Sequence, residues 1–176
     1  MQSIFGTDGI RGKFNTEITC DLATNIGFAL ATNLQSNEPI LIGRDTRESG
    51  YILFRALSEG INLAKKEVVD IGICPTPAIP FLIKEFNFSS GIMISASHNP
   101  PEYNGIKIFD SEGKKLNKSK EYEIEKSLKQ EIGETIIQSN INGLNSKKEG
   151  LLEIYENSLI QSAENISLNG LKIILD

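Results

Sequence analysis

Apolar and polar positions along this chain follow two different spacings. Short apolar runs predict buried strands, and segments with apolar residues three or four positions apart predict helices. The segment after the first strand carries Leu53, Leu57 and Ile61 at intervals of four, with Ser49 placed as its cap. The pattern predicts strands at 39–43, 67–73, 91–95 and 105–109, and helices at 21–35, 49–66, 76–86, 117–132 and 151–166. Such alternation is typical of an α/β sheet.

The last quarter of the chain follows a different pattern. Residues 133–150 are polar and interrupted by glycine, which predicts a connector. The final LNGLKIILD (168–176) predicts a turn and then an apolar strand. A strand this apolar needs neighbours on both edges and cover on both faces. Because the helix at 151–166 leads away from the sheet, we expect this strand to open a second domain.

Composition narrows the class of protein. The 176 residues suffice for one core, and 39% hydrophobic with 23% charged residues is ordinary for a soluble globular protein. The net charge of −5 argues against nucleic-acid or anionic-membrane partners, and no apolar run approaches the roughly 20 residues of a transmembrane helix. The N-terminus is too polar for a secretory signal. Cys20 and Cys74 lack metal-like spacing, so we expect reduced thiols in a cytoplasmic protein.

The loops after three of the predicted strands contain the candidate chemistry. In open α/β sheets, ligands bind beyond the carboxyl ends of the strands, where GRDTRESG (43–50), CPTPAIP (74–80) and SASHNPPEYNG (95–105) lie. FGTDGIRG (5–12) adds a glycine-rich loop. Guanidinium groups bind phosphate oxygens in a fork. We therefore expect a cationic pocket for a phosphorylated small molecule, formed by Arg11, Arg44, Arg47 and Lys107. The alternative for the first loop is a self-paired turn.

The hydroxyl of Ser97 lies on a turn that Pro100 and Pro101 keep from becoming a helix. One hypothesis makes Ser97 a hydrolytic nucleophile with His98 as its base. Adjacent side chains usually diverge, however, and the G-x-S-x-G elbow of serine hydrolases is absent. We favour a serine that carries a phosphoryl group, held by arginines and a divalent metal, with Lys107 as proton shuttle.

Four motifs in order support this hypothesis. ISASHNPPEYNGIKIF (94–109) resembles the active-serine loop of the α-D-phosphohexomutases, and FGTDGIRG, GRDTRESG and PTPA resemble the companion motifs of that family. FGTDGIRG and RESGYIL are most similar to the phosphoglucosamine-mutase branch, which interconverts glucosamine 6-phosphate and glucosamine 1-phosphate. The resemblance implies a three-layer α/β/α sandwich with a mixed, mostly parallel sheet, the first of four domains.

The resemblance also implies roles for individual residues. Ser97 matches the phosphoserine that exchanges phosphate with a sugar 1,6-bisphosphate, and its phosphate matches one ligand of a Mg²⁺ ion. Lys107 matches a general acid–base lysine, and Arg11 matches an arginine near the reacting phosphate. Substrate- or phosphate-binding positions are matched by His98, Asn99, Arg44 and Arg47, of which the two arginines are also candidates for bracing the loop.

The boundaries implied by the resemblance are a phosphoserine domain at 1–150, a helical connector at 151–170 and the start of a second domain at 171–176. The remaining mutase domains, with the other Mg²⁺ ligands and the sugar-selecting loop, are then expected outside this chain, and the chain alone is expected to be inactive. HNPPEYNG (98–105) is more typical of phosphomannomutase and phosphoglucomutase relatives, which keeps those substrates as alternatives. A non-catalytic phosphosugar-binding module is a further alternative.

Overall fold

The computed structural model describes residues 3–128, 145–146, 150–163, 166–167 and 169–174. These residues form a six-stranded sheet in the order β1-β5-β4-β2-β3-β6. Its strands are β1 (Ile10–Lys13), β2 (Ile40–Arg44), β3 (Val68–Ile73), β4 (Ser90–Ile94), β5 (Tyr103–Phe109) and β6 (Asn145–Ser146).

The strands run in two directions. β2 pairs in parallel with β3 and β4, and β3 pairs in parallel with β6. β5 runs antiparallel to β4 and to β1. The sheet is therefore mixed and mostly parallel, which confirms the expected fold class. Because β2, β3 and β4 share one direction, the loops after them emerge at the same edge, as the sequence predicted.

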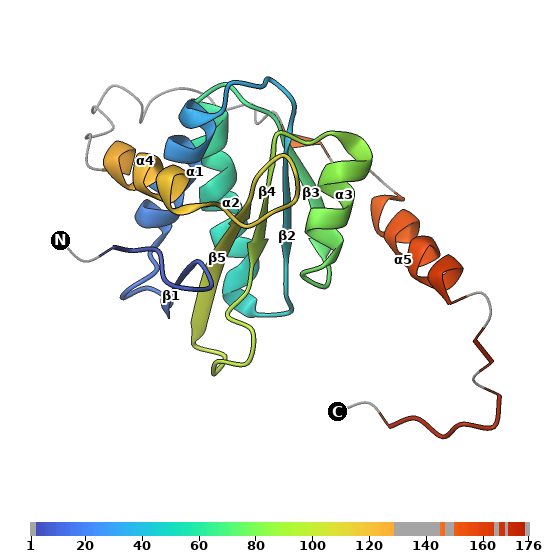
Figure 1. Ribbon diagram of the computed structural model, residues 1–176. Helices are drawn as coiled ribbons and strands as arrows, with labels where there is room; N and C mark the ends of the chain where they lie inside the picture. Colours follow the sequence, from blue (N-terminus) through green and yellow to red (C-terminus); the bar gives the residue numbers. More distant parts are fainter. Residues whose placement is uncertain (1–2, 129–144, 147–149, 164–165, 168, 175–176) are drawn as a thin grey trace.

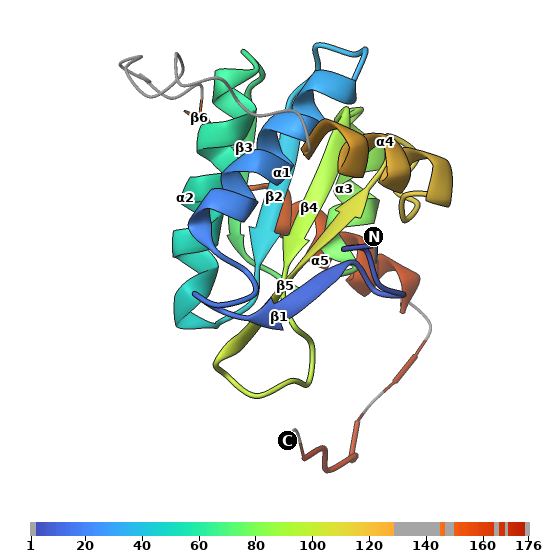
Figure 2. The ribbon, with the colours of Figure 1, turned by 90° about the vertical axis from the view of Figure 1, so that its left-hand side faces the viewer.

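Helices cover both faces of the sheet. On one face lie α1 (Cys20–Asn33) and α2 (Glu48–Leu63), with α4 (Lys118–Leu128) against α1. On the other lie α3 (Ala78–Phe86) and α5 (Leu151–Ser162) (Figures 1 and 2). Alternate residues of each strand fill the two cores, so Ile40 and Ile42 face α1 and α2 whereas Leu41 faces α3. None of the described helices is both long and apolar enough to cross a membrane.

Some expectations about elements were wrong. Ser49 does not cap α2, whose N-cap residue is Arg47; the Ser49 hydroxyl instead accepts a hydrogen bond of 2.8 Å from Asn104 Nδ2. The sequence also missed β1 and β6, which are short strands without an apolar run of their own. No strand is formed by the described residues 171–174, and Leu171 and Ile173 are exposed there.

The domain boundaries at 150/151 and 170/171 stay predictions. α5 begins at Leu151 as expected, and its Tyr155 ring packs edge-on against Phe81 of α3 at 5.5 Å between centroids. Most of the polar connector predicted at 133–150 lies outside the described residues. The same holds for the C-terminal ends of the helix predicted at 117–132 and of the predicted final strand.

Candidate functional site

An open hollow of about 550 Å³ lies at the carboxyl ends of β2 and β4. The chain leaves β2 toward β3 through α2, and it leaves β4 in the opposite direction toward β5. Adjacent strands whose connections diverge in this way open a crevice between their loops. The hollow is lined by residues of these two loops and by the first residue of α2: Asp45, Thr46, Arg47, Glu48, Ser95, Ser97, Asn99 and Pro101.

Ser97 lies in the wall of this hollow with its side chain exposed. Its backbone has a φ of 58°, in the left-handed region that side-chain-bearing residues rarely adopt. The Ser97 amide donates a 2.9 Å hydrogen bond to Ser95 Oγ, and the Asn99 amide donates to the Ala96 carbonyl at 3.2 Å. These two turns project the hydroxyl outward while both ends of the loop stay attached to the sheet.

His98 lies next to the hydroxyl. Its Nδ1 is 3.4 Å from Ser97 Oγ, so the expectation that the two side chains diverge was wrong. A base that activates a serine normally lies within about 2.6–3.2 Å and is oriented by a third group. Among the described residues no carboxylate is hydrogen-bonded to the His98 ring. The geometry gives the hydrolase hypothesis little support.

Arg47 turns its guanidinium into the Ser97 loop and away from solvent, with a side chain only 10% exposed. It donates to Asp45 and to four backbone carbonyls of the segment 97–103. Of the two roles considered for this arginine, bracing the loop is the one that its contacts show.

Arg44 lies on the far side of β2 from Ser97. Its Nη1 donates to Asp70 Oδ1 of β3 at 2.7 Å, and its guanidinium carbon lies 5.4 Å and 5.1 Å from the ring centroids of Tyr51 and Phe54. A cation over aromatic faces is attracted by the ring quadrupole. Arg44 thus joins β2, β3 and α2, and it does not line the hollow.

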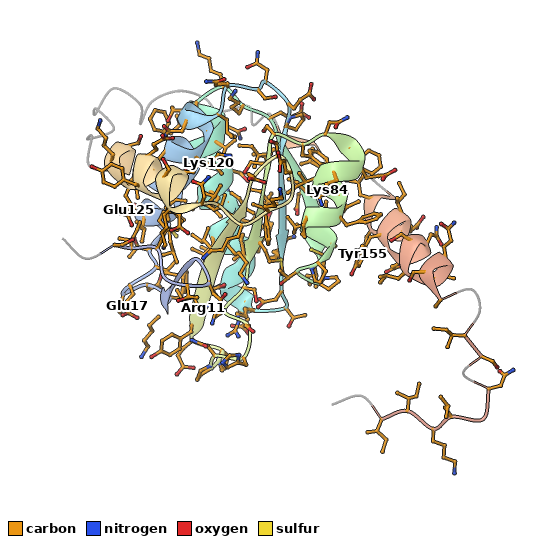
Figure 3. The ribbon with its side chains drawn as sticks, viewed as in Figure 1. Arg11, Glu17, Lys84, Lys120, Glu125 and Tyr155 are labelled. Atoms are coloured by element: carbon orange, nitrogen blue, oxygen red, sulfur yellow. The ribbon has the colours of Figure 1, made fainter. Side chains whose placement is uncertain are left out.

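Arg11 and Lys107 lie on the two strands beyond β4. Arg11 pairs with Gly105 in register, and its Nη2 donates to Asp8 at 3.1 Å. Its Nε is buried without a hydrogen-bond partner among the described residues. Figure 3 shows Arg11 at the β1 edge, near the end of the sheet where β4 joins β5. Lys107 is half-buried on the face opposite Ile106 and Ile108, as predicted.

Of the four cations predicted to share a pocket, one lines the hollow. The lining of the hollow contains one arginine, Arg47, and two carboxylates, Asp45 and Glu48. Sheet order explains the difference, because β1 is separated from β2 by two strands, and Arg44 points toward β3. The N-terminal end of α2 borders the hollow, since the helix begins at the lining residue Glu48 without a side-chain cap. The free N–H groups of a helix N-terminus carry a partial positive charge.

Sequence reasoning did not assign five residues of the lining to the site: Asp45, Thr46, Glu48, Ser95 and Pro101. Ser95 was assigned to the strand, but β4 ends at Ile94, which leaves Ser95 free to bond the Ser97 amide. The signal available was the spacing Ser-x-Ser after a strand, since serine hydroxyls bond amides two residues on.

The two thiols take no part in the site. Cys20 and Cys74 are unpaired. Burial raises the pKa of Cys74 to about 11, so its thiol stays protonated near neutral pH.

A divalent metal does not fit the described residues by themselves. No three histidine, cysteine, aspartate or glutamate side chains of these residues lie close enough together to hold one. Mg²⁺ requires several oxygen ligands in near-octahedral geometry. We therefore derive no step through a metal.

The similarities of this chain to known proteins agree with its fold. Residues 2–134 match the model of the phosphoglucomutase/phosphomannomutase α/β/α domain I. A Prochlorococcus marinus (strain MIT 9312) protein named phosphoglucosamine mutase is 58% identical over 176 residues, which are 100% of this chain and 39% of that protein. A Synechococcus sp. (strain WH7803) protein of the same name is 42% identical over 99% of this chain and 38% of its own length.

Solved structures show the same architecture. A phosphoglucomutase/phosphomannomutase family protein from Burkholderia thailandensis matches 96% of this chain and 37% of its own, with a TM-score of 0.72 and 27% identity. A putative phosphomannomutase from Thermus thermophilus matches 70% of this chain and 29% of its own, with a TM-score of 0.66 and 31% identity. With its sheet, its exposed serine loop and these matches, the chain belongs to the phosphoglucomutase/phosphomannomutase family and contains that family's α/β/α domain I.

Proposed function

We propose that this chain is the phosphoserine-bearing part of an enzyme that interconverts glucosamine 6-phosphate and glucosamine 1-phosphate. The observation that supports this most is the Ser97 hydroxyl, which is exposed on a left-handed turn in the wall of a hollow at the N-terminal end of α2. A phosphoryl group brings roughly −1.5 to −2 charges, which the positive end of a helix stabilises. The Arg47 guanidinium adds a positive charge behind the loop.

The proposed reaction consists of two transfers. In the first, the bond between phosphorus and Ser97 Oγ breaks, and the free hydroxyl of the sugar monophosphate takes the phosphoryl group. This gives a sugar 1,6-bisphosphate, and Ser97 Oγ regains a proton. In the second, Ser97 Oγ takes the other phosphoryl group, and the isomeric monophosphate is released. Proton transfer falls to Lys107, and Arg11 is assigned to the reacting phosphate.

The Asn99 and His98 side chains flank Ser97 and are assigned to the walls of the sugar site. Asn99 lines the hollow, and the His98 ring nitrogen lies 3.4 Å from the hydroxyl. Arg44 and Arg47 were also predicted to bind phosphate. Their observed contacts support a different role for each, with Arg44 joining two strands to α2 and Arg47 shaping the serine loop.

A Mg²⁺ ion remains part of the proposal through phosphorylated Ser97, whose phosphate would offer one oxygen ligand. The matched relatives are longer than this chain, which spans about 39% of their length. We assign the remaining metal ligands and the sugar-selecting groups to segments other than the described residues.

The choice of sugar follows from the relatives. The Prochlorococcus and Synechococcus relatives carry the name phosphoglucosamine mutase, whereas the two solved structures are named for phosphomannomutase or phosphoglucomutase. The higher identity of the first group favours glucosamine phosphates. Mannose and glucose phosphates are the alternatives within the same family.

The test uses a chimera in which this chain replaces the aligned 176 residues of the Prochlorococcus marinus (strain MIT 9312) relative. We expect glucosamine 1,6-bisphosphate to phosphorylate Ser97, detected by mass spectrometry of the intact peptide, and Ser97→Ala to abolish both labelling and turnover. Ser111→Ala, on an exposed turn that follows β5, is the matched control and keeps both. A Ser97→Ala chimera with normal turnover contradicts the proposal. Faster turnover of mannose 6-phosphate than of glucosamine 6-phosphate would assign mannose phosphates as the substrates and leave the proposed mechanism unchanged.

A further inference from the structure

Arg47 directs four of its five guanidinium N–H groups to the loop that carries Ser97. Its Nη1 donates to the carbonyls of Pro100 at 2.7 Å and Tyr103 at 3.0 Å, and its Nη2 donates to those of Ser97 at 2.9 Å and Asn99 at 2.8 Å. Its Nε donates to Asp45 at 3.0 Å. A guanidinium has five N–H groups, so every donor of this arginine has a protein partner and none is left for a ligand.

The position of the guanidinium is itself fixed. Asp45 accepts from the Arg47 side chain through Oδ2 and from the Arg47 amide through Oδ1 at 3.1 Å. The Asp45 amide donates to the Ile94 carbonyl at 3.0 Å, which attaches this turn to the end of β4. Arg47 is also the N-cap residue of α2. The arginine is therefore anchored to two rigid elements on either side of the hollow.

These contacts hold both ends of the Ser97 turn. The Ser97 carbonyl is bonded to Arg47 while its amide is bonded to Ser95 Oγ, so the residue is constrained on both sides of its left-handed Cα. The Tyr103 carbonyl marks the first residue of β5, so the guanidinium spans the loop from its serine to the start of the next strand. Four carbonyls converging on one cation form an arrangement that would be unfavourable without it.

We propose that Arg47 is the positioning residue of the phosphoserine loop, which sets the direction of the Ser97 hydroxyl without touching the substrate. This inference rests on the function proposed above and deepens it. The role requires a guanidinium group and not merely a positive charge. Lysine has the charge but only three donors on a tetrahedral nitrogen, so it cannot hold four carbonyls and a carboxylate in one plane.

The first experiment measures the loop directly in the 176-residue chain by amide hydrogen exchange. In Arg47→Lys we expect the amides of Ser97, Asn99 and Tyr103 to exchange at least about tenfold faster, while amides in α1 and α3 keep their wild-type rates. Arg55→Lys, an exposed arginine of the same helix, is the matched control and leaves the loop unchanged. Unchanged loop exchange in Arg47→Lys overturns the inference whether or not the chain has mutase activity.

The second experiment separates positioning from substrate binding in the chimera. A positioning role predicts that Arg47→Lys lowers kcat at least about tenfold and changes KM for glucosamine 6-phosphate less than about twofold. Added guanidinium ion should restore part of the activity of Arg47→Ala, and ammonium ion should not. A raised KM with unchanged kcat overturns the inference in favour of direct phosphate binding. If Ser97 is never phosphorylated in the unmodified chimera, the proposed function fails, and the exchange rates alone decide the role of Arg47.

Discussion

Ser97 adopts a left-handed backbone conformation that is unfavourable for a residue with a Cβ atom. The left-handed region costs an L-residue roughly 1–2 kcal/mol because Cβ approaches the following carbonyl oxygen. Of the described non-glycine residues, Ser97 shares a positive φ with Asn15, Lys65 and Asn87, and it is the one that lines the hollow. Strained residues of this kind persist only where surrounding contacts hold them, as the bonds from Arg47 and to Ser95 do here.

This strain predicts an unusual order of stabilities at one position. We expect Ser97→Gly to be more stable toward urea than Ser97→Ala by about 1 kcal/mol, because glycine adopts φ of 58° without a steric penalty. Both variants lack the hydroxyl, so neither should accept phosphate. At Ser111, whose φ is not positive, glycine should be the less stable of the two substitutions. Equal stabilities at position 97 would mean that the turn relaxes when the hydroxyl is removed.

Two arginines three residues apart show what the sequence does and does not encode. Arg44 and Arg47 belong to one motif and were predicted to belong to one cationic pocket. The structure directs Arg44 to Asp70 on β3 and Arg47 to the loop after β4. Apart from Asp45, which Arg47 also contacts, their partners are 26 and 50 to 56 residues away along the chain, so no local pattern contains these distant contacts.

Helices α1 and α2 owe their close packing to glycine. A Cβ on Gly60 would lie far inside contact distance of the Thr24 carbonyl oxygen of α1, and a Cβ on Gly27 would meet the Leu57 carbonyl of α2 in the same way. The absence of these two side chains brings the backbones together. The packing in turn fixes the N-terminal end of α2, which contributes Arg47 and Glu48 to the hollow.

We therefore expect Gly60→Ala to lower the free energy of unfolding by about 1–3 kcal/mol, although alanine is the better helix former. Gly50→Ala in the same helix is the control, since its Cβ would lie 3.5 Å from the nearest atom, an ordinary contact. That variant should be neutral or slightly stabilising. Thermal and urea unfolding followed by circular dichroism measure both. A Gly60→Ala protein as stable as wild type would show that the two helices can move apart freely.

The strands show a similar division between local and distant causes. The four strands that were predicted have apolar runs, and their burial follows from those runs. The direction of β5 does not follow from its apolar run, because the pattern fits a parallel or an antiparallel neighbour equally well. β1 was missed since its four residues, IRGK, contain one buried isoleucine and a glycine, and it forms only against β5.

The molecule as a whole presents its serine loop on an open surface. The hollow is formed by two loops of one sheet edge, and the described residues supply no set of three metal ligands. The chain spans about 39% of the length of the relatives it matches. The phosphoryl transfer proposed above depends on positioning both reactants and neutralising charge, which one wall of a site cannot do alone.

We expect the purified 176-residue chain to show no measurable conversion of glucosamine 6-phosphate, whereas the chimera converts it. A coupled assay for glucosamine 1-phosphate measures both, and circular dichroism of the isolated chain confirms that it is folded. Turnover by the isolated chain would contradict this prediction. It would also mean that residues 1–176 contain a complete site.

By itself the sequence determined the helices and four of the six strands, that β2, β3 and β4 end at one edge, and that Ser97 lies on a turn at that edge. Apolar spacing and proline act locally, so these features follow from neighbouring residues. Only the tertiary structure decided the order of the strands, the reversal of β5 and the partners of Arg44 and Arg47. A side chain's partners depend on which distant backbone the sheet brings beside it, and that is settled when the whole core packs.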